Sequence, residues 1–137
     1  MSMLKTLDVS TSGLVAQRIR MTATASNLAN ITSRRNEDGQ LQPYQPRFTI
    51  FQTNEGIGPN GAAGVHVREI VRDDIAPQPV YDPTNPDADA QGYIYFPRIN
   101  MMTEMTDAIV ASRSYEANLG AIEITKSMLN QTLRIIT

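Results

Sequence analysis

Apolar residues recur at seven-residue intervals near both ends of the chain, and the sequence between these two regions follows no such period. Near the start, the repeat consists of Leu7, Leu14, Met21 and Leu28. Near the end, one row consists of Met101, Ala108, Tyr115, Ile122, Leu129 and Ile136, and a second interleaved row of Met105, Ser112, Leu119, Lys126 and Leu133. This spacing is typical of helices that pack on other helices. It predicts long helices over 3–30 and 100–136.

The two predicted helices differ in intrinsic strength. Serine, threonine and Gly13 lower the helix propensity of the first, which therefore needs external packing to persist. Asn27 and Asn30 lie at its C-terminal end, and asparagine tolerates the left-handed conformation that ends many helices. The second helix has a candidate N-cap in Asn100 and a basic residue, Arg134, in its last turn.

The middle of the chain changes to a period of two. Residues 47–52 and 64–71 alternate apolar and polar side chains and are predicted to be strands, and residues 93–96 a third, shorter strand. Pro77 and Pro79 favour an extended segment before that third strand.

These elements predict an α+β fold in which the terminal helices pair as a coiled coil around a small insert. We expect residues 1–35 and 98–137 to form the helical domain and residues 36–97 the β-rich insert. Its β-rich part, residues 43–97, has about 55 residues, which is marginal for independent stability, so the insert should lean on the helices or on neighbouring chains. The sequence predicts no role for the loops over 34–42 and 54–64.

Charge and composition argue against several classes of function. The chain has 137 residues, enough for one ordinary domain, and a net charge of −2. Residues 1–35 carry +4, residues 36–100 carry −5 and the rest −1. This weakly basic arm beside an acidic middle does not favour nucleic acid, which requires a basic face. The absence of cysteine excludes disulfides and thiol chemistry. No apolar run suggests a membrane span or a secretory signal.

The sequence offers little catalytic or ligand-binding chemistry. The single histidine, His66, lies in a strand pattern without a cysteine or second histidine to join it. Asp87 to Gly92 resembles the first half of a calcium loop, but the twelfth position, which needs a glutamate, is Arg98. We interpret this segment, within the acidic loop 82–92, as a turn that positions Tyr93, with a calcium site as the alternative. We predict no catalytic residue, cofactor or metal.

Several motifs resemble those of a known family. They are Ser12-Gly13-Leu14-Val15-Ala16-Gln17, Met21, Ala25-Ser26-Asn27-Leu28-Ala29-Asn30, Pro43-Tyr44, Tyr81-Asp82-Pro83, Gly92-Tyr93, Glu104-Met105, Ala111-Ser112-Arg113-Ser114-Tyr115-Glu116-Ala117-Asn118 and Thr125-Lys126-Ser127-Met128. Together they resemble the bacterial flagellar basal-body rod protein family, and within it the proteins of the proximal rod.

The resemblance implies a structural subunit of the flagellar drive shaft, exported by the flagellar type III system and assembled in the periplasmic space to transmit torque in motility. It implies paired terminal helices that line the inner part of a helical tube. The implied partners are other rod proteins, further copies of the chain, the export-gate adaptor at the rod base and the surrounding ring.

The seven-residue apolar rows and the resemblance together indicate which residues take part in assembly. We expect packing between helices to depend on Leu7, Leu14, Met21, Leu28, Met105, Tyr115, Leu119, Ile122, Leu129 and Leu133, and we expect Asn27 and Asn30 to fix the end of the first helix. The alternative is a soluble coiled-coil adaptor whose β insert binds one partner.

Overall fold

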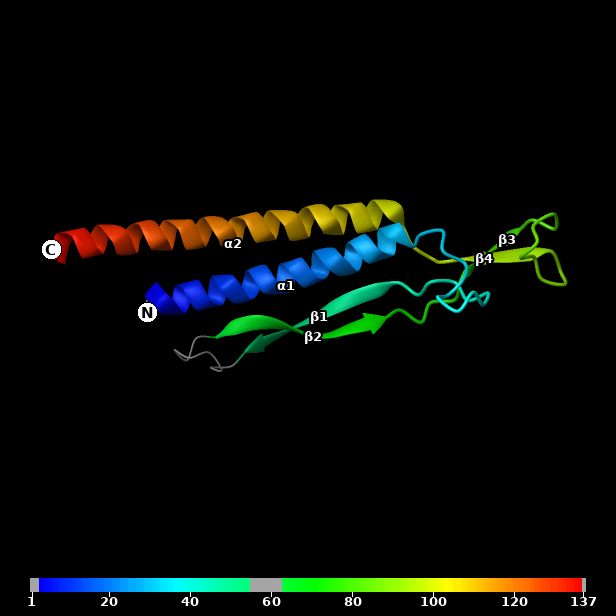
Figure 1. Ribbon diagram of the computed structural model, residues 1–137, viewed down its shortest axis with the longest axis horizontal. Coiled ribbons are helices and arrows are strands. Elements are labelled where there is room, and N and C mark those ends of the chain that lie inside the picture. Colours follow the sequence, from blue (N-terminus) through cyan, green and yellow to red (C-terminus); the bar gives the residue numbers. More distant parts are fainter. Residues whose placement is uncertain (1–2, 55–62, 137) are drawn as a thin grey trace.

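The computed structural model describes residues 3–54 and 63–136 of the chain. Its elements are α1 (Met3–Ala29), β1 (Arg47–Asn54), β2 (Gly64–Arg72), β3 (Gln78–Tyr81), β4 (Tyr93–Phe96) and α2 (Met101–Ile136). The molecule is elongated, with α1 and α2 antiparallel and side by side (Figure 1). The predicted α+β class, with two long helices and a small β insert, is confirmed. Most of the loop expected over 54–64 lies outside the described residues.

Three cross-helix contacts mark the line along which α1 and α2 meet, which we call the helix seam. Gly13 lies against Asn118, whose amide would be 3.0 Å from an added Cβ. Arg20 donates to Asp107 at 2.9 Å.

The third of these contacts is the hydrogen bond from Asn27 to Glu104 at 3.1 Å. Positions 13, 20 and 27 recur every seven residues, one residue before the leucine row that begins at Leu7. The period was therefore predicted correctly, but the residues at the centre of the seam are small or polar.

The buried interior is correspondingly thin. Within the described residues, the buried apolar side chains are Ala16, Ala23, Ile94 and Ala111, and the buried polar ones are Ser10, Thr24, Asn27 and Thr125. Small side chains let the helix backbones approach closely but remove little apolar surface from water. The helix pair therefore gains modest hydrophobic stabilisation from its own contacts.

Strands β1 and β2 form an antiparallel hairpin that lies along α1, on the side away from α2 (Figure 1). The register runs from Arg47 opposite Arg72 to Asn54 opposite Gly64, with a bulge between Ile50 and Phe51. The far end of this hairpin is fastened to α1, because the Val65 N–H donates to Ser12 Oγ at 3.0 Å. The part of the insert that contains β1 and β2 thus leans on the helices.

The other pair of strands, β3 and β4, forms a separate antiparallel sheet beyond the ends of the helices (Figure 1). We call this part, residues 78–96, the distal module. It is fastened to the loop after α1 by two arginines. Arg34 stacks on the Phe96 ring at 5.5 Å, and both Arg34 and Arg35 pair with the Asp87 carboxylate. The insert consists of two small sheets with different supports.

Two glycine substitutions should have opposite effects on stability. In Gly64→Ala the new Cβ would lie 2.6 Å from Ser12 Oγ, so the hairpin must move and its hydrogen bond weaken, which should cost about 1–3 kcal/mol. In the control, Gly120→Ala, the new methyl group meets nothing within 4 Å and should stabilise α2 by about 0.5–1 kcal/mol. Urea unfolding followed by circular dichroism measures both, and equal effects would contradict the docking at Ser12.

Candidate assembly site

One buried side chain joins three parts of the molecule near the C-terminal end of α1. Asn27 is 3% exposed, and its amide uses its full hydrogen-bonding capacity. Its Nδ2 donates to the Arg47 carbonyl at 2.8 Å and to Glu104 Oε2 at 3.1 Å. Its Oδ1 accepts from the Arg47 N–H at 2.8 Å and from the Tyr44 hydroxyl at 3.1 Å. The side chain thus binds the first residue of β1 as a neighbouring strand would.

The end of α1 depends on the second asparagine. Asn30 Nδ2 donates to the Ser26 carbonyl at 2.9 Å, which satisfies one of the free carbonyls of the last turn. The left-handed termination expected from the sequence is wrong, because no non-glycine residue in the described ranges has a positive φ. The asparagines act through their side chains, and Asn27 holds a strand while Asn30 holds the helix end.

The predicted packing residues fall into two groups. Those that flank the helix seam are half-buried, namely Leu7, Leu14, Met21, Leu28, Tyr115, Ile122 and Leu129. Those of the second row of α2 are exposed, namely Met105, Leu119 and Leu133. Leu119, for example, keeps 42% of its surface accessible. The first group is thus partly covered within the chain, and the second group stays accessible.

Sequence reasoning overlooked several further apolar side chains that α2 exposes. The largest exposed fractions among them belong to Ile109, Ile124 and Ile135, with 61% for Ile109 and 65% for Ile124. They lie outside the two seven-residue rows. They would have been found by considering the apolar residues on every face of the helix, and not only on the face that carries the seven-residue rows.

The acidic loop 82–92 is held together by its own carboxylates. The Asp87 carboxylate forms ion pairs with Arg34 and Arg35, and its side chain is only 10% exposed. The Tyr93 N–H donates to Asp89 Oδ1 at 2.8 Å, and this bond lowers the pKa of Asp89. A bond from the Thr84 side chain likewise lowers the pKa of Asp82.

These bonds favour the turn interpretation over a calcium site. Among the described residues there is no group of three or more acidic, histidine or cysteine side chains placed to hold a metal ion. His66 lies exposed on β2. Neither described helix is apolar enough over sufficient length to cross a bilayer.

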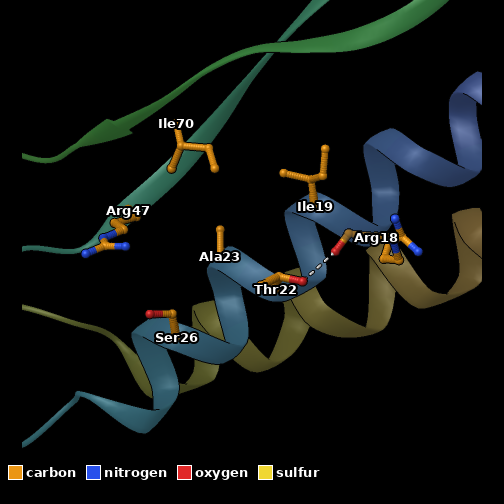
Figure 2. A pocket seen from close by; sticks show the side chains of 7 residues that line it. All are labelled: Arg18, Ile19, Thr22, Ala23, Ser26, Arg47 and Ile70. Atoms are coloured by element: carbon orange, nitrogen blue, oxygen red, sulfur yellow. Dashed lines mark hydrogen bonds between the residues drawn. The ribbon is translucent and has the colours of Figure 1, made fainter.

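A groove separates the C-terminal half of α1 from the β1–β2 hairpin (Figure 2). We call it the arginine groove, and its lining residues are Arg18, Ile19, Thr22, Ala23, Ser26, Arg47 and Ile70. Figure 2 shows Ile19 and Ala23 on the side of α1 that faces the strands, and Ile70 opposite them. The hairpin is tied to α1 at Ser12 and at Asn27, so the groove lies between these two attachment points.

Two protein-family models match the two helical parts of the chain. Residues 7–31 match the model described as flagella basal body rod protein, and residues 90–135 match the C-terminal region of the flagellar basal body rod FlgEFG proteins. Both models describe flagellar rod proteins. This class accounts for a chain whose terminal helices pair and expose apolar surface.

Curated relatives make the assignment more specific. The chain is 39% identical to the flagellar basal-body rod protein FlgC of Bacillus subtilis strain 168, over 98% of this chain and 99% of the relative. It is 43% identical to FlgC of Aquifex aeolicus over 96% of each chain, and 38% identical to FlgC of Escherichia coli O157:H7 over 98% of each. The chain therefore belongs to the FlgC family of flagellar basal-body rod proteins. It is a structural subunit of the rod of the flagellar basal body.

Removing the buried amide should destabilise the protein strongly. Asn27→Ala leaves the Arg47 backbone and the Glu104 carboxylate without this partner and removes one of the two bonds of the Tyr44 hydroxyl, which keeps Ser26, and the change should cost about 3 kcal/mol. The control is Asn130→Ala, an exposed asparagine on α2, which should change stability by less than about 0.5 kcal/mol. Urea unfolding measures both values. A loss below about 1 kcal/mol for Asn27→Ala would show that the network contributes little.

Proposed function

We propose that α1 and α2 form the core of the contacts between subunits in the proximal rod, and that torque passes from subunit to subunit through these contacts. The observation that carries the proposal is the distribution of side chains on the helix pair. Small and polar residues occupy the helix seam, whereas many larger apolar residues of α2 remain accessible. The apolar surface is available to other chains because the chain does not use it internally.

Fully burying a large aliphatic side chain stabilises the covered state by about 1.5–3 kcal/mol, and a side chain that is about half exposed in the free subunit contributes about half as much. Ile109, Leu119 and Ile124 alone offer three such side chains on one helix. Contacts of this kind offset the entropy of ordering a subunit, whereas the alanine and glycine of the seam offer little.

The arrangement of these side chains favours an open assembly. Ile109 and Ile124 are fifteen positions apart on α2, with Leu119 between them, so accessible apolar surface extends along the helix. A contact that joins two different patches of the same chain repeats without closing when the rotation between subunits does not return to its start. We infer that the partners are copies of the chain and other rod proteins, with the export-gate adaptor at the base and the surrounding ring as further neighbours.

This proposal also assigns roles to the two parts of the chain. Residues 1–35 and 98–137 would form the inner part of the tube, and residues 36–97 would face outward. The supporting feature is that the hairpin covers only the side of α1 away from α2 (Figure 1). The rest of the helix pair stays open to neighbours. Family membership favours this assignment over a soluble adaptor.

A charge on the outer face of α2 should abolish assembly without unfolding the subunit. In Leu119→Asp the carboxylate replaces a side chain that is already 42% exposed, so the stability of the isolated chain should change by less than about 1 kcal/mol. Burial of that charge between subunits is costly, so cells that carry the variant should lose swimming motility and contain no complete rods. The measurements are urea unfolding, swimming in soft agar and electron microscopy of basal bodies.

The matched control is Gln131→Asp, which introduces the same charge at an exposed polar position of α2. It should leave both stability and motility close to those of the parent chain. Normal motility with complete rods in Leu119→Asp would contradict the proposal that this face of α2 lies between subunits.

A further inference from the structure

One face of the distal module consists almost entirely of tyrosine. Tyr81 lies opposite Tyr93 in the β3–β4 register, and Pro79 lies opposite Tyr95. Side chains alternate between the faces of a strand, so these four residues share one face, which we call the tyrosine face. Ile94, on the opposite face, is buried. The tyrosine face therefore points away from the support that the distal module receives from the rest of the chain.

The tyrosine face stays accessible in the described part of the chain. Tyr81 is 64% exposed, and Tyr93 and Tyr95 are both exposed. The Tyr81 and Tyr93 rings meet edge to face, 5.3 Å apart, so the face has a fixed shape. Tyrosine is enriched at protein interfaces because it supplies a large contact area at low entropic cost. A two-stranded sheet alone is marginally stable, and a partner on this face would add support.

One carboxylate, that of Asp89, lies at the edge of the tyrosine face and gives this edge a negative charge. The Tyr95 hydroxyl donates to Asp89 Oδ2 at 3.1 Å. The pKa of Asp89 is lowered chiefly by its bond from the Tyr93 backbone, so the carboxylate stays ionised at neutral pH. Tyrosine rings beside an ionised carboxylate suit a guanidinium group, which both of them attract.

The arginine groove offers the complementary chemistry. Arg18 and Arg47 are exposed, and neither side chain pairs with a carboxylate among the residues that the structure describes. Between them, Ile19 and the half-exposed Ile70 supply apolar surface. The Arg47 guanidinium lies over the Tyr44 ring, 5.8 Å from its centroid, whereas that of Arg18 has no such ring contact among the described residues. The groove thus combines guanidinium groups with aliphatic side chains, as the tyrosine face combines rings with the Asp89 carboxylate.

We propose that the tyrosine face of one copy of the chain binds in the arginine groove of the next copy. Within one copy the two surfaces are apart, because the distal module projects beyond the helix ends whereas the groove lies beside the C-terminal half of α1, between it and the β1–β2 hairpin (Figures 1 and 2). The contact joins two different surfaces, so it repeats from copy to copy and stays open when the rotation between copies does not return to its start. The inference rests on the proposed rod assembly, and it adds a specific partner and a specific pair of surfaces to it.

The absence of cysteine allows a direct test by cross-linking. One copy carries Tyr95→Cys, a second copy with a distinguishable tag carries Ile70→Cys, and the two are expressed together in cells that lack the parental gene. Isolated basal bodies are treated with a short bismaleimide. We expect a dimer that carries both tags. Either variant expressed alone should give no dimer, because each copy then has a cysteine on one surface only.

Each result decides the inference. A dimer formed by Tyr95→Cys alone would show that the tyrosine faces of two copies contact each other. A cross-linked product of another mass would show that a different protein binds the tyrosine face. Either result would overturn the proposal. So would basal bodies that contain both variants but no mixed dimer, and in that case the proposed rod function would still stand. Absence of the chain from basal bodies would instead count against the rod function itself.

A second pair of variants guards against local damage. Tyr93→Cys with Ile19→Cys tests the same contact without altering the bond between Tyr95 and Asp89, and it should give the same mixed dimer.

A charge change at Arg18 then tests whether the guanidinium group contributes to the contact. Arg18→Glu should reduce the mixed dimer by roughly tenfold, whereas Arg18→Lys and the control Arg113→Glu on α2 should retain it. An undiminished yield in Arg18→Glu would overturn the role assigned to the guanidinium group.

Discussion

The fold depends on the buried amide of Asn27. Small side chains along the helix seam permit close packing but do not by themselves select one register, since alanine and glycine fit at many offsets. The Asn27 amide does select one, because a shift of either helix would leave a buried donor or acceptor without its partner. Its bonds to the Arg47 backbone extend the same register to the hairpin. One side chain therefore aligns α1, α2 and β1.

The sequence was most informative where its periodicity was strong. The helix expected over 3–30 is observed as Met3–Ala29, and the expected strands over 47–52 and 64–71 are observed as β1 and β2. The centre of the helix seam was harder to locate, because the leucine row is the stronger hydrophobic signal and lies only one position away. A pattern also cannot tell whether its own chain or a neighbour covers an apolar row, and the exposed Leu119 illustrates this.

The partners of the polar side chains could not be predicted from sequence. Asn27 looked like a helix-ending residue, but it binds Arg47, twenty positions later, in a segment with no helical period. Asp87 looked like part of a cation-binding loop, and it pairs with Arg35, fifty-two positions earlier. Local spacing describes what a residue does within its own element. These two side chains act between elements, where only the tertiary structure determines which groups meet.

The two attachment points of the hairpin have a mechanical consequence. Ser12 and Asn27 lie fifteen residues apart on α1, about 22 Å along its axis, and each holds a different end of the same hairpin. A rotation of one end of α1 relative to the other would carry these points around the axis by different angles. The paired strands would then have to shear or release a bond. The hairpin thus raises the torsional stiffness of α1, a useful property for a helix in a rotating shaft.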